Sequence, residues 1–140
     1  MRRETAIRNA RQIRDRIAKG GGIIGTPECH NTAVRISRAW LFGSTAKGSA
    51  SPNDLDILVD MAVCGQHQVA KPRKGQRQAK RDKKARPAGS TVAINALDDA
   101  AKYLRSGMKK VSIHDFKVDG HYQDIAATKI MIYPRWDVAE

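Results

Sequence analysis

At 140 residues the chain has the length of one domain, which is enough to bury a substantial hydrophobic core. No run approaches the ~18 apolar residues of a transmembrane helix, and the basic N-terminal segment lacks the apolar stretch of a secretory signal. The formal net charge is +12. We therefore expect one cytoplasmic domain over residues 1–140, with no membrane partner.

The positive charge is concentrated in residues 66–90, which hold nine Lys and Arg residues and one acid, Asp82. This segment has no aromatic residue, and its composition is typical of a flexible insert. Runs of like charge often contact nucleic acid, although nothing here would stack on bases. The sequence does not decide whether this segment binds a polyanion or is a solvated loop. The nucleic-acid contact candidates are Lys71, Arg73, Lys74, Arg77, Lys80, Arg81, Lys83, Lys84 and Arg86.

The first third of the chain predicts one helix and leaves a second stretch undecided. Ile7, Ala10 and Ile17 recur at helical spacing over residues 2–19, and the three glycines at 20–22 would end this helix. Its other face is basic, and a solvated face is a more common explanation than a nucleic-acid contact. Residues 23–37 fit either a loop or a short helix over 28–36.

Two strands are predicted around a Gly-Ser turn. Residues 39–42 are apolar and stop at Gly43, as in a buried strand, and residues 44–48 favour a helical turn. A loop over 49–54 leads to a second strand at 55–59. Alternate side chains of a strand share a face, so Asp54 and Asp56 would point the same way. Two half-buried carboxylates repel each other unless a cation lies between them, which makes this pair a candidate metal site.

The C-terminal part predicts a helix, a strand and a second helix. The helix spans 91–105, with Ser90 or Thr91 as its cap, and the strand spans 111–118. Residues 122–133 favour a closing helix that ends before Pro134. These elements indicate an α/β (α+β) fold with a small mixed sheet of three or more strands flanked by helices. A zinc site built from Cys29, His30, Cys64 and His67 is less consistent with their spacing than buried free cysteines.

The segments LFGSTAKG (41–48) and NDLDILVD (53–60) resemble the nucleotidyltransferase superfamily of DNA polymerase beta. They are most similar to the minimal nucleotidyltransferases, a group that includes antitoxin partners of HEPN-type toxins. The family pattern is an apolar strand, Gly-Ser, a small helix and then Asp-x-Asp between apolar residues. Lys47 stands where arginine is usual. Weaker similarity extends over 91–134, with the basic segment as an insertion.

The resemblance implies a polymerase-beta-like fold and Mg²⁺-dependent transfer of a nucleoside monophosphate from ATP or another nucleoside triphosphate to a hydroxyl of a protein or RNA. Asp54 and Asp56 would hold Mg²⁺, and Gly43, Ser44 and Lys47 would contact the phosphates. The third carboxylate of the family falls at Ser112. Asp115 would serve as the third catalytic acid if a bulge or a one-residue shift turned it inward.

A domain of this size lacks an acceptor-binding module, so a toxin-like partner protein or a homo-oligomer is implied. The alternative interpretation is a catalytically degenerate nucleotidyltransferase fold. It would bind RNA, DNA or a protein through residues 66–90.

Overall fold

The computed structural model describes residues 1–25, 33–64 and 88–139, with side chains from Ala96 onward in the helix that begins at Ala88. The nine basic candidates between residues 71 and 86 lie outside this range. So do Cys29, His30 and His67 of the zinc alternative, whereas Cys64 is exposed.

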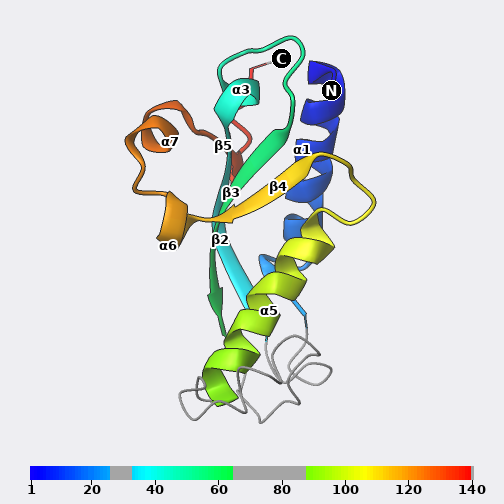
Figure 1. The fold of residues 1–140 in the computed structure, drawn as a ribbon. Coiled ribbons are helices and arrows are strands. Elements are labelled where there is room, and N and C mark those ends of the chain that lie inside the picture. Colours follow the sequence, from blue (N-terminus) through cyan, green and yellow to red (C-terminus); the bar gives the residue numbers. More distant parts are fainter. Residues whose placement is uncertain (26–32, 65–87, 140) are drawn as a thin grey trace.

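The described residues form helices and a five-stranded mixed sheet (Figure 1). In the sheet β3 pairs antiparallel with β2 and parallel with β4, while β1 and β5 both pair antiparallel with β2. This arrangement confirms the predicted α/β fold with a small mixed sheet flanked by helices. In chain order the elements are α1 (Arg3–Lys19), β1 (Ile23–Ile24), β2 (Val34–Phe42), α3 (Gly43–Ala46), β3 (Leu55–Val63), α5 (Ala88–Leu104), β4 (Val111–Asp115), α6 (Phe116–Asp119), α7 (Gln123–Thr128) and β5 (Ile130–Tyr133).

The two faces of the sheet are covered by different helices. The main core lies on the face that packs against α1 and α5, and it includes Leu41, Ile57 and Ile132. A smaller cluster lies on the other face, where Trp40, Phe42 and Leu58 contact residues of α6 and α7. Neighbouring residues of β3 point to opposite faces of the sheet. Ile57 and Val59 therefore belong to the main core, whereas Leu58 belongs to the smaller cluster.

The N-terminal helix follows the predicted pattern. Ala6, Ala10, Ile13 and Ile17 recur at intervals of three or four residues and are fully buried against the sheet. Arg16 lies beside this stripe, and its guanidinium donates hydrogen bonds to the carbonyls of Leu104 and Ser106 at 3.0 and 2.9 Å. The contact joins α1 to the C-terminal end of α5.

Of the stretch 23–37, which fits a loop or a short helix over 28–36, residues 26–32 lie outside the described range, and the parts at 23–24 and from Val34 onward are strands. The start of the third helix also differs from the prediction. Strand β2 begins at Val34, five residues earlier than expected, because Val34 and Ile36 add a second pair of buried positions. Strand β3 likewise continues to Val63 to pair with them. Helix α5 begins at Ala88, so Ser90 and Thr91 lie within it rather than at its cap.

The predicted strand at 111–118 and helix at 122–133 are also corrected. Strand β4 ends at Asp115, whose side chain caps the short helix α6. Helix α7 ends at Thr128, and residues 130–133 form β5. The sequence there is Ile-Met-Ile-Tyr, which favours a strand, and the free edge of β2 gives it a pairing partner. Among the described residues, no helix has both the length and the apolar character needed to cross a membrane.

Candidate functional site

The Gly-Ser turn and the second aspartate meet at one end of the β2–β3 pair. Phe42, the last residue of β2, is the cross-strand partner of Asp56. Gly43 follows with φ +72°, a left-handed conformation that favours glycine. A Cβ atom on Gly43 would lie 2.8 Å from Oδ2 of Asp56. The backbone of the turn therefore packs directly against the Asp56 carboxylate, which would have to shift if residue 43 had a Cβ atom.

Helix α3 is fixed from two sides. Thr45 is fully buried, and its hydroxyl lies 3.5 Å from the carbonyl oxygen of Asp54, at the long limit of a hydrogen bond. The Arg3 guanidinium donates a 2.6 Å hydrogen bond to the carbonyl of Thr45. Ser44 and Lys47 are exposed on the same short helix. The turn is thus anchored through buried contacts, while its two polar side chains face solvent.

Asp56 is a partly buried carboxylate with two titratable neighbours. Its side chain is 28% exposed, and its Oδ1 lies 3.7 Å from Nε2 of His114. Burial raises the pKa of Asp56, the neighbouring His114 opposes this rise, and the charge of Asp54 adds to it. Asp54 is exposed and immediately precedes β3. A carboxylate that is desolvated next to a second acid is a position where a bound cation is stabilising.

His114 belongs to the site because of the parallel pairing of β3 and β4. The register aligns Asp56 with Ser112 and Leu58 with His114, so all four side chains lie on the face of the smaller cluster. The His114 ring also packs edge-on against Phe42, with ring centroids 5.1 Å apart.

A contact that the sequence did not predict holds the other side of this imidazole. Nδ1 of His114 lies 3.0 Å from Oδ2 of Asp119. Asp119 was expected to lie in a turn after a longer strand, and the early end of β4 brings it back toward His114. The signal that would have revealed this is Asp115 itself, an N-cap residue directly before a four-residue helix.

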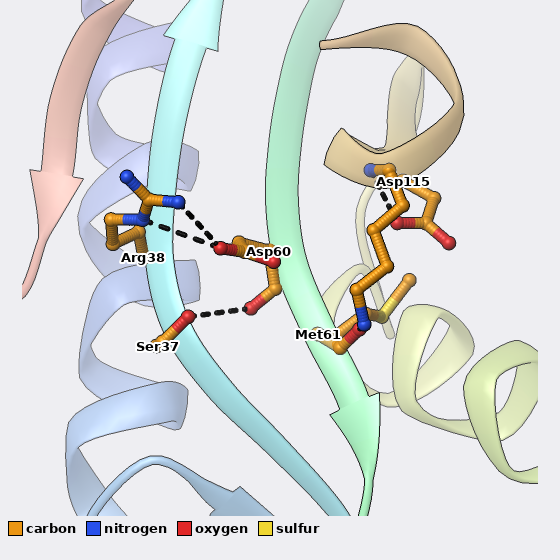
Figure 2. Close-up of polar contacts among 6 residues, drawn as sticks. Ser37, Arg38, Asp60, Met61 and Asp115 are labelled. Carbon is orange, nitrogen blue, oxygen red and sulfur yellow. Dashed lines mark hydrogen bonds and ion pairs between the residues drawn. The ribbon is translucent and has the colours of Figure 1, made fainter.

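Asp115, the candidate third carboxylate, does not join Asp56. It aligns with Val59, on the face opposite Asp56, and the β3–β4 register continues without a shift from Leu55 to Val59. Its carboxylate accepts a 3.0 Å hydrogen bond from the backbone N–H of Lys117 (Figure 2). The shift that would have turned Asp115 inward is absent from this register, and its side chain instead caps α6.

A row of aromatic and basic side chains continues from the site along the same face of the sheet. The guanidinium of Arg38 lies 5.1 Å from the ring centroids of both Trp40 and Phe116. It also pairs with Asp60 across the β2–β3 pair at 2.8 Å (Figure 2). Lys129 approaches the Trp40 ring at 5.6 Å. These contacts give this part of the face a fixed, partly cationic surface.

The carboxylates and imidazole of this end of the sheet are the donors that a metal ion would meet. Among the described residues, no three His, Cys, Asp or Glu side chains converge as a complete metal cluster. Asp56 and His114 nevertheless present two adjacent donors, and the Asp54 carboxylate is close enough to act on the Asp56 pKa. Divalent cations on nucleotides commonly take one or two carboxylates and complete their shell with water and phosphate oxygens. Asp54 and Asp56 are the two carboxylates that such a cation would take, and among the described residues they belong to no group of three potential ligands.

Comparison with known proteins adds no family assignment. No family model, no curated protein and no solved structure matches this chain.

Proposed function

We propose that this protein is a Mg²⁺-dependent nucleotidyltransferase that moves a nucleoside monophosphate from a nucleoside triphosphate, with ATP as the expected donor, to a hydroxyl group. The observation that supports this most is the packing of Gly43 against Asp56, with 2.8 Å between the glycine's Cβ position and Oδ2. A site for a metal-bound triphosphate needs a turn whose backbone is not covered by a side chain, and it needs a carboxylate beside that turn. Gly43 and Asp56 provide these two features. The resemblance of residues 41–60 to the polymerase beta superfamily points to the same chemistry.

Each residue of the site then has a distinct task. Asp54 and Asp56 would hold Mg²⁺, whose charge neutralises the attacking and leaving oxygens of the transfer. Ser44 in α3 and Lys47 at its C-cap are exposed and would contact phosphate oxygens. Gly43 would let the phosphates approach the backbone. The rigid anchoring of α3 through Thr45 would keep these groups in place without reorganisation during the reaction.

The acceptor would come from another molecule. The hydroxyl would belong to a partner protein of the toxin type, to RNA or to another copy of the chain. We place the activity in the cytoplasm, where nucleoside triphosphates are abundant.

The test is transfer of label from α-³²P-ATP in the presence of Mg²⁺ and cell extract. Wild type should label an acceptor, and the double variant Asp54→Asn/Asp56→Asn should not. Asp15→Asn is the matched control, because it removes an exposed carboxylate of α1 paired with the adjacent Arg14. The proposal fails if wild type transfers no label, or if the double variant transfers as much as the control.

A second candidate is a degenerate fold that binds nucleic acid or protein through residues 66–90 without catalysis. The position of Asp115 favours it, because Ser112 stands in register with Asp56 where a third acid is expected. In this case wild type should bind RNA or DNA with a steep dependence on salt, and deletion of residues 71–86 should abolish binding. Binding that survives the deletion, or that ignores salt, would exclude this candidate.

A further inference from the structure

We propose that a basic rim around the N-terminal end of β3 binds the sugar–phosphate backbone of single-stranded RNA, and that the acceptor of the transfer is the terminal hydroxyl of this RNA. The acceptor role rests on the proposed function. The binding surface does not, because it is built from side chains that the proposed site leaves unused. The basic rim consists of Arg2, Arg3, Lys109 and Lys110.

Three hydrogen bonds bring the basic rim together from distant parts of the chain. The backbone N–H of Arg3 donates to the carbonyl of Ala50 at 3.1 Å, and its guanidinium donates to the carbonyl of Thr45 at 2.6 Å. On the other side, the N–H of Leu55 donates to the carbonyl of Lys110 at 2.9 Å. Figure 1 shows the N-terminal end of α1 at the same end of the sheet as α3. The rim therefore flanks the connection that leads from α3 into β3.

The side chains of the basic rim present their charge to solvent. Arg2 and both lysines are exposed, and Arg3 is partly exposed. The guanidinium of Arg3 donates to a neutral carbonyl, so this contact leaves its charge uncompensated. Glu4 and Asp54 are exposed acids of the same region, and the rim leaves an excess of positive charge over them. Clustered lysine and arginine side chains attract the phosphates of a nucleic acid and release its counterions.

Lys110 is held in a backbone conformation that is unfavourable for lysine. Its φ is +58°, and in the part of the chain that the structure describes it is the only residue other than glycine with a positive φ. Glycine adopts this left-handed region freely, whereas a Cβ atom is crowded there. Residues held in such conformations cluster where the side chain has a function. A lysine at this position is explained if its ammonium group is needed for binding.

The connection between the two halves of the rim offers partners for ribose. Ser51 and Asn53 are exposed on it, and each side chain can both donate and accept a hydrogen bond. The 2′-hydroxyl group of ribose also donates and accepts, and it is the group by which proteins distinguish RNA from DNA. A strand that crosses this connection therefore meets cations for its phosphates and polar side chains for its ribose groups. The connection starts at α3, where the proposed transfer takes place.

The test is fluorescence anisotropy of a labelled oligouridylate of about 12 nucleotides, titrated with the full chain at several salt concentrations. EDTA is present, so that the result does not depend on a bound cation. Each phosphate contact on a single strand contributes about 0.7 to the slope of log K against log salt, or about fivefold in affinity at about 0.1 M salt. Lys109→Gln/Lys110→Gln should therefore lower the slope by about 1.4 and weaken binding about 25-fold.

Lys19→Gln/Arg35→Gln is the matched control. It removes the same charge from two exposed residues at the other end of the sheet, where α1 ends and β1 pairs with β2. Charges more than about 10 Å from the strand are largely screened at about 0.1 M salt, so the control should change affinity by less than about twofold.

Lys110→Gly separates binding from folding. It removes the ammonium group and relieves the left-handed backbone, so it should weaken RNA binding about fivefold while it melts at or above the temperature of wild type. A loss of binding in this variant does not come from loss of the fold.

Several results would overturn the basic rim. Wild type that does not bind RNA, or RNA binding that Lys109→Gln/Lys110→Gln reduces no more than the control does, would each do so. Binding of the DNA strand of matching length with equal affinity would overturn the assignment to RNA. Equal competition by an acidic peptide of the same charge would overturn it too, because the rim would then serve an acidic protein partner equally well.

The labelling experiment keeps the proposed function separate. Label that resists ribonuclease and is lost with protease would place the acceptor on a protein, which overturns RNA as the acceptor and leaves the transferase intact. RNA binding that depends on the rim, without any transfer of label, would support the rim and contradict the proposed function.

Discussion

Any side chain on Gly43 would crowd the carboxylate of Asp56, which would have to shift to make room. The Cβ position of Gly43 lies 2.8 Å from Oδ2 of Asp56, and its φ of +72° lies in the left-handed region. Glycine is favoured at this position for two separate reasons: it adopts the left-handed backbone conformation, and it has no Cβ atom to crowd Asp56.

A pair of glycine variants separates these two demands. Gly43→Ala should lower the free energy of unfolding by about 2–4 kcal/mol, the sum of a left-handed alanine and a crowded carboxylate. Gly48→Ala is the control, because Gly48 has φ +87° but open space at its Cβ position. It should cost only about 1–2 kcal/mol. Urea denaturation measures both, and equal losses would show that the contact with Asp56 carries no energy.

Asp56→Asn should stabilise the metal-free protein at neutral pH. Burial raises the pKa of Asp56 in the folded state above the ordinary value of 3.8. The folded state therefore holds the proton more tightly, and wild type loses stability as the pH rises from the unfolded pKa through the folded one. The melting temperature of Asp56→Asn should exceed that of wild type at pH 7, and this difference should shrink toward pH 3.5. A variant less stable than wild type at pH 7 without metal would contradict this.

An added divalent cation should make wild type melt at a higher temperature than Asp56→Asn at pH 7. A cation that binds the folded state raises its stability by mass action. Mn²⁺ should therefore raise the melting temperature of wild type and leave that of Asp56→Asn unchanged. Chelation with EDTA should return wild type to its lower value. An equal response of the two proteins would place the cation elsewhere.

Asp115→Asn should leave transfer of label within about twofold of wild type. Asp115 caps α6 by accepting from the N–H of Lys117, and asparagine is about as good at an N-cap as aspartate. Stability should change by less than about 0.5 kcal/mol. A loss of transfer without a loss of stability would mean that Asp115 reaches the reacting atoms after all.

Arg16→Gln should destabilise the domain by about 1–3 kcal/mol. The guanidinium donates to the carbonyls of Tyr103, Leu104 and Ser106, where α5 ends and its dipole favours a cation. Arg8→Gln is the control, because Arg8 is exposed on the same helix. Equal melting temperatures for the two variants would show that this contact is dispensable.

The sequence predicted the parts of the fold that depend on local patterns. The α1 stripe, the two central strands and the Gly43 turn follow from apolar spacing and from one glycine. It failed at residues 130–133, where strand formation depends on a free edge of β2, far away in the chain. It also failed at Asp115, since one capping hydrogen bond ended β4 early. The early end of β4 lets Asp119 reach His114, and the N-cap residue Asp115 is the only sequence signal of this contact that we identify.

Strand β2 is paired along one edge by two short strands that come from opposite ends of the chain. β1 pairs at Val34 and Arg35, and β5 pairs at Ala39 to Leu41, two residues before Gly43. During synthesis, the segment that leads into the site therefore stays open along this edge until residues 130–133 have left the ribosome. The residues of the Gly43 turn are therefore made well before β5, the strand that pairs with β2 beside them.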